Sequence, residues 1–185
     1  MCCGRSWHQV RRAGGRFATQ PAATLPGLPR LAENLRVDVA THISARPDEV
    51  WARVSTFAGV NHELGPLLRM SEPPGGETID PATVPIGVRW FRSRLLLFGR
   101  IPVDYDDLTF VSITPGRGFH ERSAMRSMRI WEHERTLETV AGGTFVRDRV
   151  SFIPRVRVAR RLQRAAVAWT FRRRHRRLRA YFSEL

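Results

Sequence analysis

Lysine is absent from this chain of 185 residues, and all 31 of its lysine-or-arginine positions are arginine. Arginine carries a planar, permanently charged fork that binds carboxylates and phosphates through paired hydrogen bonds. A complete loss of lysine is explained more simply by a GC-rich, bacterial genome than by selection at every site. We therefore expect many of the arginines to be ordinary solvated cations.

Cysteine is almost as scarce. The chain contains only Cys2 and Cys3, which are adjacent and have no other cysteine to pair with. This excludes a disulfide framework and a cysteine-based metal site, and it favours a reducing compartment. No stretch approaches the roughly 18 consecutive apolar residues of a transmembrane helix. We expect a cytoplasmic protein, or one held peripherally at a membrane surface.

Sequence motifs of metal, cofactor and nucleophile chemistry are also lacking. The six histidines show no HxH or HExxH spacing. There is no phosphate-binding P-loop and no dinucleotide-binding GxGxxG, and no serine lies in a nucleophile elbow. We therefore expect neither a metal nor a cofactor.

The net charge of +14 is concentrated at the two ends of the chain. Residues 1–34 carry +4, residues 35–154 are neutral, and residues 155–185 carry +10. Because the body is neutral, we do not expect a dedicated, sequence-specific nucleic-acid-binding domain. We interpret residues 1–34 as a basic, disordered leader, with a transit peptide as the alternative, and residues 35–185 as a single domain.

Hydrophobic patterning predicts a strand and two short helices, then a strand-rich middle, then a long helix. Residues 37–44 alternate as in a strand, Pro47 marks the start of a helix, and a second short helix is predicted at about 61–68. A loop at 71–85 precedes the other strands. These are predicted at about 86–97, 100–106, 108–114, 118–124, 128–139 and 144–153.

Residues 157–183 contain no glycine or proline and predict a long C-terminal helix. Its apolar residues form two stripes on nearly opposite faces, at about 100° per residue. One stripe comprises Val158, Leu162, Ala165, Ala166 and Trp169, and the other comprises Val167, Phe171, Leu178 and Phe182. A single straight helix cannot bury both stripes on one sheet. We therefore expect the helix to bend or break near residue 169, or its first half to pack on something else.

The hairpin at 128–154 can be predicted in register. A four-residue loop at 140–143 joins two alternating segments. The predicted cross-strand pairs on the inward face are Trp131 with Phe152, His133 with Val150 and Arg135 with Asp148. Polar groups on such a face need partners. We favour a buried Arg135–Asp148 pair with a hydrogen-bonded His133, and keep open that these groups project into a cavity and orient a ligand headgroup.

The order of elements resembles that of the SRPBCC superfamily, the START-like and Bet v 1-like group that includes polyketide cyclases and lipid-transport proteins. Residues 43–51 (ISARPDEVW) are similar to the end of that group's first strand. Residues 129–135 (RIWEHER) and 171–178 (FRRRHRRL) resemble the hairpin and terminal helix of uncharacterised bacterial members. The resemblance implies an α+β helix-grip fold, in which a curved antiparallel sheet wraps around a long C-terminal helix.

The resemblance also implies a cavity between sheet and helix that binds a hydrophobic small molecule such as a lipid, polyketide or isoprenoid. The residues we predict to contact this ligand are Trp90, Phe119, Trp131, His133, Arg135, Asp148, Val150 and Phe171. We expect a binding protein. The alternative is a cyclase or dehydratase that uses His133 as its proton carrier. The oligomeric state stays open.

The arginine-rich helix has three interpretations. Its arginines form a solvated face, or they attract anionic lipid headgroups, or they bind nucleic acid without specificity. The arginines we assign to a membrane contact are Arg172, Arg173, Arg174, Arg176 and Arg177.

Overall fold

The computed structural model describes residues 34–75, 78–156 and 158–184, so the predicted leader lies outside the described residues except for Asn34. The elements follow the predicted order. They are β1 (Leu35–Ile43), α1 (Pro47–Val54), α2 (Phe57–Leu64), β2 (Leu68–Met70), β3 (Arg89–Leu97), β4 (Ile101–Thr114), β5 (Gly118–Met125), β6 (Met128–Val140), β7 (Gly143–Pro154) and α3 (Arg160–Ser183).

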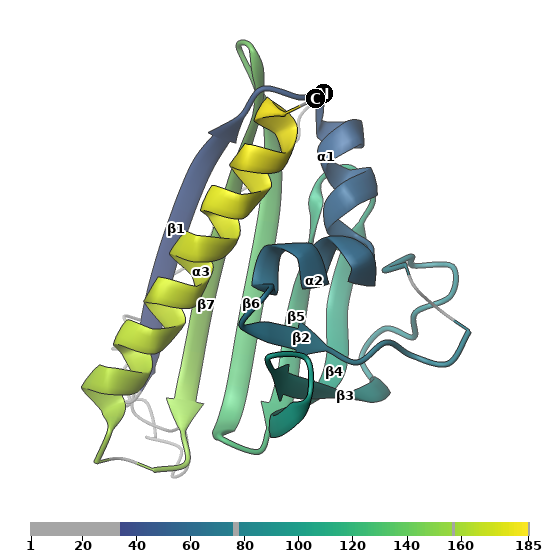
Figure 1. Ribbon diagram of the computed structural model, residues 1–185. Coiled ribbons are helices and arrows are strands. Elements are labelled where there is room, and N and C mark those ends of the chain that lie inside the picture. The colour runs from purple at the N-terminus through teal and green to yellow at the C-terminus, as the bar shows by residue number, and fades with distance from the viewer. Residues whose placement is uncertain (1–33, 76–77, 157, 185) are drawn as a thin grey trace, which may run out of the picture. The chain divides into compact units, whose positions relative to one another are not determined.

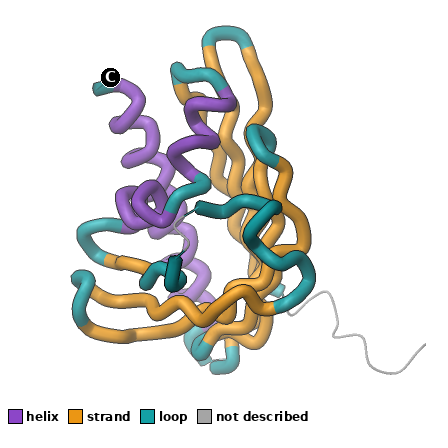
Figure 2. The backbone as a smooth tube through the Cα atoms, turned by 90° about the vertical axis from the view of Figure 1, so that its right-hand side faces the viewer, coloured by secondary structure: helices purple, strands orange, loops and turns teal. Residues whose placement is uncertain are grey.

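The seven strands form one antiparallel sheet in the order β1-β7-β6-β5-β4-β3-β2. The helix α3 runs along β1 and β7, and α1 and α2 lie beside it on the same side of the sheet (Figure 1). Figure 2 shows the strands bending around the helices from one side. This is the α+β helix-grip arrangement that the sequence predicts. None of the described helices is long and apolar enough to span a membrane.

The register of the β6–β7 hairpin is confirmed. Trp131 pairs with Phe152, His133 with Val150 and Arg135 with Asp148. The turn is tight because Gly142 and Gly143 both have positive φ, at 77° and 151°. A Cβ on Gly143 would lie only 2.1 Å from the carbonyl oxygen of Ile43, so this position also requires glycine for close packing against the end of β1.

The second helix was predicted too far along the chain. It spans Phe57–Leu64 rather than 61–68, because Thr56 caps it. The Thr56 Oγ1 accepts a hydrogen bond from the Gly59 N–H at 3.0 Å, which satisfies one of the free N–H groups of the first turn. Leu68, the last residue assigned to this helix, instead begins the short strand β2, which was not predicted.

The predicted strands at 100–106 and 108–114 are one continuous strand, β4. Asp107, at the predicted break, remains in register opposite Arg92 of β3. Their side chains form a two-fold hydrogen-bonded ion pair, with Arg92 Nε and Nη2 at 2.8 and 2.9 Å from the two Asp107 oxygens. The register shifts lie elsewhere. The pairing of β3 with β4 shifts between Arg89 and Phe91 and between Leu95 and Leu96, and the pairing of β4 with β5 shifts between Phe110 and Ser112.

Of the alternatives that the two stripes allow, a break of the C-terminal helix near residue 169 is contradicted, because α3 is continuous from Arg160 to Ser183. The helix buries only one of its two apolar stripes. Phe171 and Leu178 are 3% and 1% exposed, whereas Leu162 and Trp169 of the other stripe are 72% and 49% exposed. All five residues of the stripe that contains Leu162 and Trp169 are exposed.

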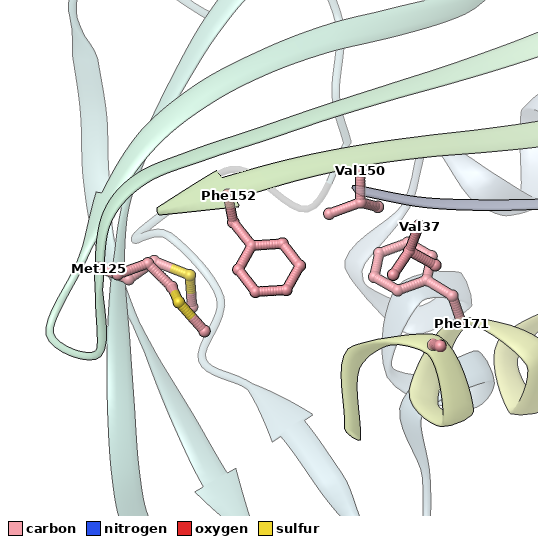
Figure 3. Close-up of a cluster of buried hydrophobic side chains, with 7 residues drawn as sticks. Val37, Met125, Val150, Phe152 and Phe171 are labelled. Carbon is pink, nitrogen blue, oxygen red and sulfur yellow. The ribbon is translucent and has the colours of Figure 1, made fainter. Parts of the chain in front are cut away.

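Three apolar clusters form the core on the concave side of the sheet. The cluster drawn in Figure 3 joins β1, β5, β7 and α3 through Val37, Met125, Val150, Phe152 and Phe171. A second joins β1, α1 and the far end of α3, and a third lies under α2 and β3–β5. Between these clusters lies a group of buried charged residues.

Candidate functional site

Arg135 on β6 is the centre of a buried ion network. Its Nε and Nη2 donate to the two carboxylate oxygens of Asp148, both at 2.7 Å. Its Nη1 and Nη2 donate to the two oxygens of Glu63 on α2, at 2.9 and 3.0 Å. The three side chains are at most 1% exposed. Arg135 therefore joins the hairpin to α2 through two paired contacts with carboxylates.

The helix α3 adds two more members to this network. Arg174 Nε donates to Glu63 Oε2 at 2.9 Å, and His175 Nε2 lies 3.0 Å from Asp148 Oδ2. Both residues are buried. The sheet, α2 and α3 are thus held together by one connected set of charges in the interior.

His133 sits between two carboxylates on the same sheet face. Its Nε2 is 3.1 Å from Asp148 Oδ1, and its Nδ1 is 3.8 Å from Glu121 Oε2. The rings of Phe119 and Phe171 pack edge-on against it, with centroids 5.1 and 5.0 Å away. Burial disfavours the imidazolium, but the carboxylate of Asp148, helped by Glu121, outweighs it and raises the pKa of His133 above its ordinary value.

The carboxylates of the network are held in their charged form. Burial alone would raise the pKa of Glu63, but Arg135 and Arg174 lower it below its ordinary value. The same balance, with Arg135 and His133 as the partners, holds the pKa of Asp148 well below its usual range. Each buried charge therefore has an opposite partner, as burial of ions requires.

A second buried polar group lies on β4 and β5. Ser123 Oγ donates to Glu121 Oε1 at 2.7 Å, and Asp106 lies beside them, only 4% exposed. Asp106 Oδ1 has no hydrogen-bond donor among the described residues. Burial and the neighbouring Glu121 carboxylate raise the pKa of Asp106 well above its ordinary value, which favours the neutral form of this carboxyl group.

The structure gathers most of the predicted ligand residues around one centre. The Trp131 ring lies near Phe152 and Phe171, and the His133 ring contacts both Phe119 and Phe171. Trp90 lies further off, beside Phe57 and Phe91 in the cluster under α2. Arg135 and Asp148 use their hydrogen-bonding groups on each other and on neighbouring residues, which is the arrangement favoured from the sequence. A ligand role for these eight residues stays a prediction.

Sequence reasoning missed Glu63, Asp106 and the inward role of His175. Glu63 and His175 reach the network from elements far away in the chain, and neither belongs to a recognisable motif. For Glu63 the signal available was its place in a short helix among apolar residues, where an unpaired carboxylate would be costly.

Three of the five arginines assigned to a membrane contact make contacts within the protein instead. Arg174 is 8% exposed and bonded to Glu63, so its assignment is corrected. Arg173 Nη2 and Arg177 Nε donate to the carbonyl oxygens of Gly65 and His62, at 2.5 and 2.7 Å. Arg172 and Arg176 are exposed.

An apolar groove lies between α3 and the edge of the sheet formed by β2 and β3. Its volume is about 210 Å³. The residues that line it are Glu63, Leu64, Leu67, Leu68, Leu97, Ala166, Trp169, Thr170 and Arg173. The Nε of Arg173 is buried and has no hydrogen-bond partner among the described residues. Glu63 also belongs to the ion network, so the groove and the network share this residue.

In the part of the chain that the structure describes, no group of three or more histidine, cysteine, aspartate or glutamate side chains is placed to hold a metal ion.

Residues 41–182 match the model of a family described as a domain of unknown function (DUF8410), and the chain belongs to this family. No curated protein matches its sequence significantly.

Solved structures share the fold at low sequence identity. Protein CV1439 from Chromobacterium violaceum superposes with a TM-score of 0.60 at 13% identity, over 82% of this chain and 98% of that one. The ZhuI aromatase/cyclase from Streptomyces sp. R1128 gives 0.59 at 14% identity, over 81% and 94%. A START superfamily protein from Mycobacterium smegmatis gives 0.57 at 9% identity, over 80% and 97%. The resemblance to the SRPBCC superfamily is confirmed at the level of the fold.

Proposed function

We propose that this member of the DUF8410 family binds a hydrophobic small molecule between its curved sheet and α3, and that the ligand enters through the groove beside Leu97 and Trp169. The observation that carries the proposal is the groove itself. Its walls are leucine, alanine and tryptophan side chains supplied by α2, the α2–β2 loop, β2, β3 and α3. Mostly apolar walls with a few placed polar groups are typical of small-molecule sites.

The polar groups in the groove suggest what the ligand carries at one end. Arg173 has a buried Nε–H that finds no acceptor in the described part of the chain, and a buried donor left unsatisfied costs about 1–3 kcal/mol. A ligand carbonyl, hydroxyl, carboxylate or sulfonate oxygen would satisfy it. We therefore favour an amphipathic ligand, with an apolar body and an oxygen-bearing end near Arg173.

The groove is small for a complete ligand. Its volume of about 210 Å³ lies below the roughly 300–1,000 Å³ of common ligand pockets. A lipid, polyketide or isoprenoid would have to displace side chains such as Leu97 and Trp169, or shift α3 away from the β2–β3 edge. The half-buried Trp131 and Leu95, which lie next to the interior cluster, give such a ligand apolar surface to contact further in.

An enzyme of the cyclase or dehydratase type is the second candidate. It rests on His133, whose place between Asp148 and Glu121 raises its pKa and favours the protonated form that a proton donor needs. A substrate would first have to displace the Phe171 or Phe119 ring that covers the imidazole. Replacing His133 by Gln should then abolish turnover but leave ligand binding unchanged, whereas loss of the fold would assign the residue to the core.

Ligand binding can be tested with 1-anilinonaphthalene-8-sulfonate, which joins an apolar ring system to an anionic sulfonate, and with uncharged Nile red. We expect saturable fluorescence enhancement for both probes with the wild-type protein. Leu97→Glu should abolish both signals because it places a charge in the groove. Arg173→Met should weaken binding of the sulfonate probe about tenfold, in line with loss of a charge-assisted hydrogen bond, and leave Nile red unchanged.

Val140→Glu is the matched control, because Val140 is an exposed apolar residue on the distant β6–β7 turn. It should bind both probes as the wild type does. Native mass spectrometry of the purified protein should in addition find a co-purifying mass that is lost in Leu97→Glu. Equal probe binding by wild type and Leu97→Glu would refute the proposed site.

A further inference from the structure

The outward face of α3 carries an unusual ridge. Leu162, Ala165, Trp169, Arg172 and Arg176 follow one another at alternating spacings of three and four residues, which places them along one face of the helix. All five are exposed, although they belong to a helix whose opposite face is packed on the core. A surface helix normally presents polar residues on its outer side. We call these five residues the outer ridge.

The first half of the ridge is apolar, and no other part of the chain that the structure describes buries it. Leu162 is 72% exposed, and Val158, just before the helix, is 99% exposed. Isolated surface leucines are common, but a tryptophan, a leucine and small residues in line form a continuous apolar strip. Such a strip is unfavourable in water and favourable against an apolar partner.

The second half of the ridge is cationic. Arg172 and Arg176 have no salt-bridge partner among the described residues, and neither does Arg161 at the start of the helix. No Asp or Glu occurs between Arg155 and Ser183. Arginine at the N-terminal end of a helix also opposes the helix dipole, so its position there does not stabilise α3.

The turn between β3 and β4 adds a second exposed apolar element next to the groove. Leu97 and Trp169 both line the groove, and Leu97 is followed directly by Phe98. Phe98 is 61% exposed and has a φ of 53°, a backbone conformation that is uncommon for an aromatic residue. The turn therefore displays a phenyl ring to solvent next to Arg100.

We propose that the outer ridge and the β3–β4 turn dock onto the surface of an anionic lipid bilayer. Leu162, Trp169 and Phe98 would enter the interfacial layer, where tryptophan is favoured, and the arginines would lie against lipid phosphates. Both lipids and nucleic acids offer phosphates to the arginines. The aliphatic strip favours the bilayer, because Leu162 and Val158 have no favourable contact to make with a nucleic-acid backbone. The docking does not rest on the proposed cargo. If both hold, the groove opens at the membrane surface.

The test is co-sedimentation of the full chain with phosphatidylcholine vesicles that contain or lack about 30% phosphatidylglycerol. We expect binding only to the anionic vesicles, and we expect it to weaken steeply as the salt concentration rises. Arg172→Glu/Arg176→Glu should reduce the partition coefficient by at least about 25-fold, since each arginine near such a surface contributes about fivefold. Leu162→Glu should also abolish binding.

Arg122→Glu/Arg129→Glu is the matched control, because it makes the same change in net charge at two exposed arginines of β5 and β6. It should bind as the wild type does. Quenching of tryptophan fluorescence by brominated lipid should be strong for the wild type and largely lost in Trp169→Phe, which keeps an aromatic ring on the ridge.

Two results would overturn the proposal. In one, both double variants lose vesicle binding equally, which would show that net charge alone is responsible. In the other, Leu162→Glu retains binding to vesicles, or the chain binds DNA with a strong salt dependence and ignores vesicles, which would assign the arginines to nucleic acid.

Discussion

Arg135 shows how a single residue can organise the interior of this fold. A guanidinium without exposure to water is costly, and here four of its N–H contacts go to two carboxylates. Glu63 and Asp148 are in turn shared with Arg174, His133 and His175. Removing the central cation would leave two buried carboxylates competing for weaker partners.

We predict that Arg135→Ala lowers the free energy of unfolding by about 3–5 kcal/mol, the range found when one partner of a buried ion pair is removed. The control is Arg147→Ala, which breaks the partly exposed pair with Asp38 on the outer sheet face and should cost less than about 1 kcal/mol. Urea unfolding followed by circular dichroism measures both. Similar losses in the two variants would contradict the view that Arg135 organises the core.

The sequence predicts the part of this network that lies within one hairpin. Period-two alternation and a glycine turn place Arg135 opposite Asp148, and the structure has that pair. Glu63 and His175 could not be placed in the same way. They come from two helices whose position over the sheet is set by long-range packing, and no local periodicity records that packing.

At the scale of elements, the β6–β7 turn fixes more than its own hairpin. Gly143 approaches the end of β1 so closely that a Cβ would lie 2.1 Å from the Ile43 carbonyl oxygen. Next to it, Thr144 Oγ1 donates to the Ala45 carbonyl at 2.7 Å, just before α1 begins. The hairpin thus anchors the passage from the first strand to the first helix.

Gly143→Ala should therefore destabilise the protein by about 3 kcal/mol, through strain at a positive φ and displacement of β1. Gly142→Ala is the matched control, with a φ of 77° but open space around its Cα, and should cost about 1–2 kcal/mol. Thermal unfolding of the two variants gives the comparison. Equal losses would show that close packing against Ile43 has no energetic weight.

The C-terminal helix shows the limit of periodicity as a guide. Two apolar stripes on opposite faces are visible in the sequence. The expectation of a bend, a break or a second packing partner follows only if both stripes must be buried. The structure keeps the helix whole and leaves the stripe with Leu162 and Trp169 exposed. Hydrophobic spacing identifies the faces of a helix, but it does not say which face the protein itself covers.

At the scale of the whole molecule, the buried titratable groups change the stability of the fold with pH in opposite directions. The pKa values of Glu63 and Asp148 are lowered in the folded state, so these residues stabilise the fold above their ordinary values of 4.5 and 3.8, and that contribution is lost as the pH falls through the folded values. The pKa of His133 is raised. The stabilisation that His133 contributes is complete below pH 6.5, its ordinary pKa, and is lost as the pH rises through its pKa in the folded protein.

Asp106 acts in the same direction as His133. Its pKa is raised well above 3.8, so the folded protein keeps a proton that the unfolded chain releases, and stability falls as the pH rises beyond that value. The free energy of unfolding should therefore be greatest in mildly acidic solution, and decline both below about pH 4 and towards alkaline pH.

Asp106→Asn preserves a hydrogen-bond donor towards Glu121 without a titrating proton. We expect it to be more stable than the wild type at pH 7 and to have a shallower decline between pH 5 and 8. Urea unfolding across that range measures both slopes, and a wild-type stability that climbs steadily from pH 5 to 8 would show that neither Asp106 nor His133 is protonated in the folded protein.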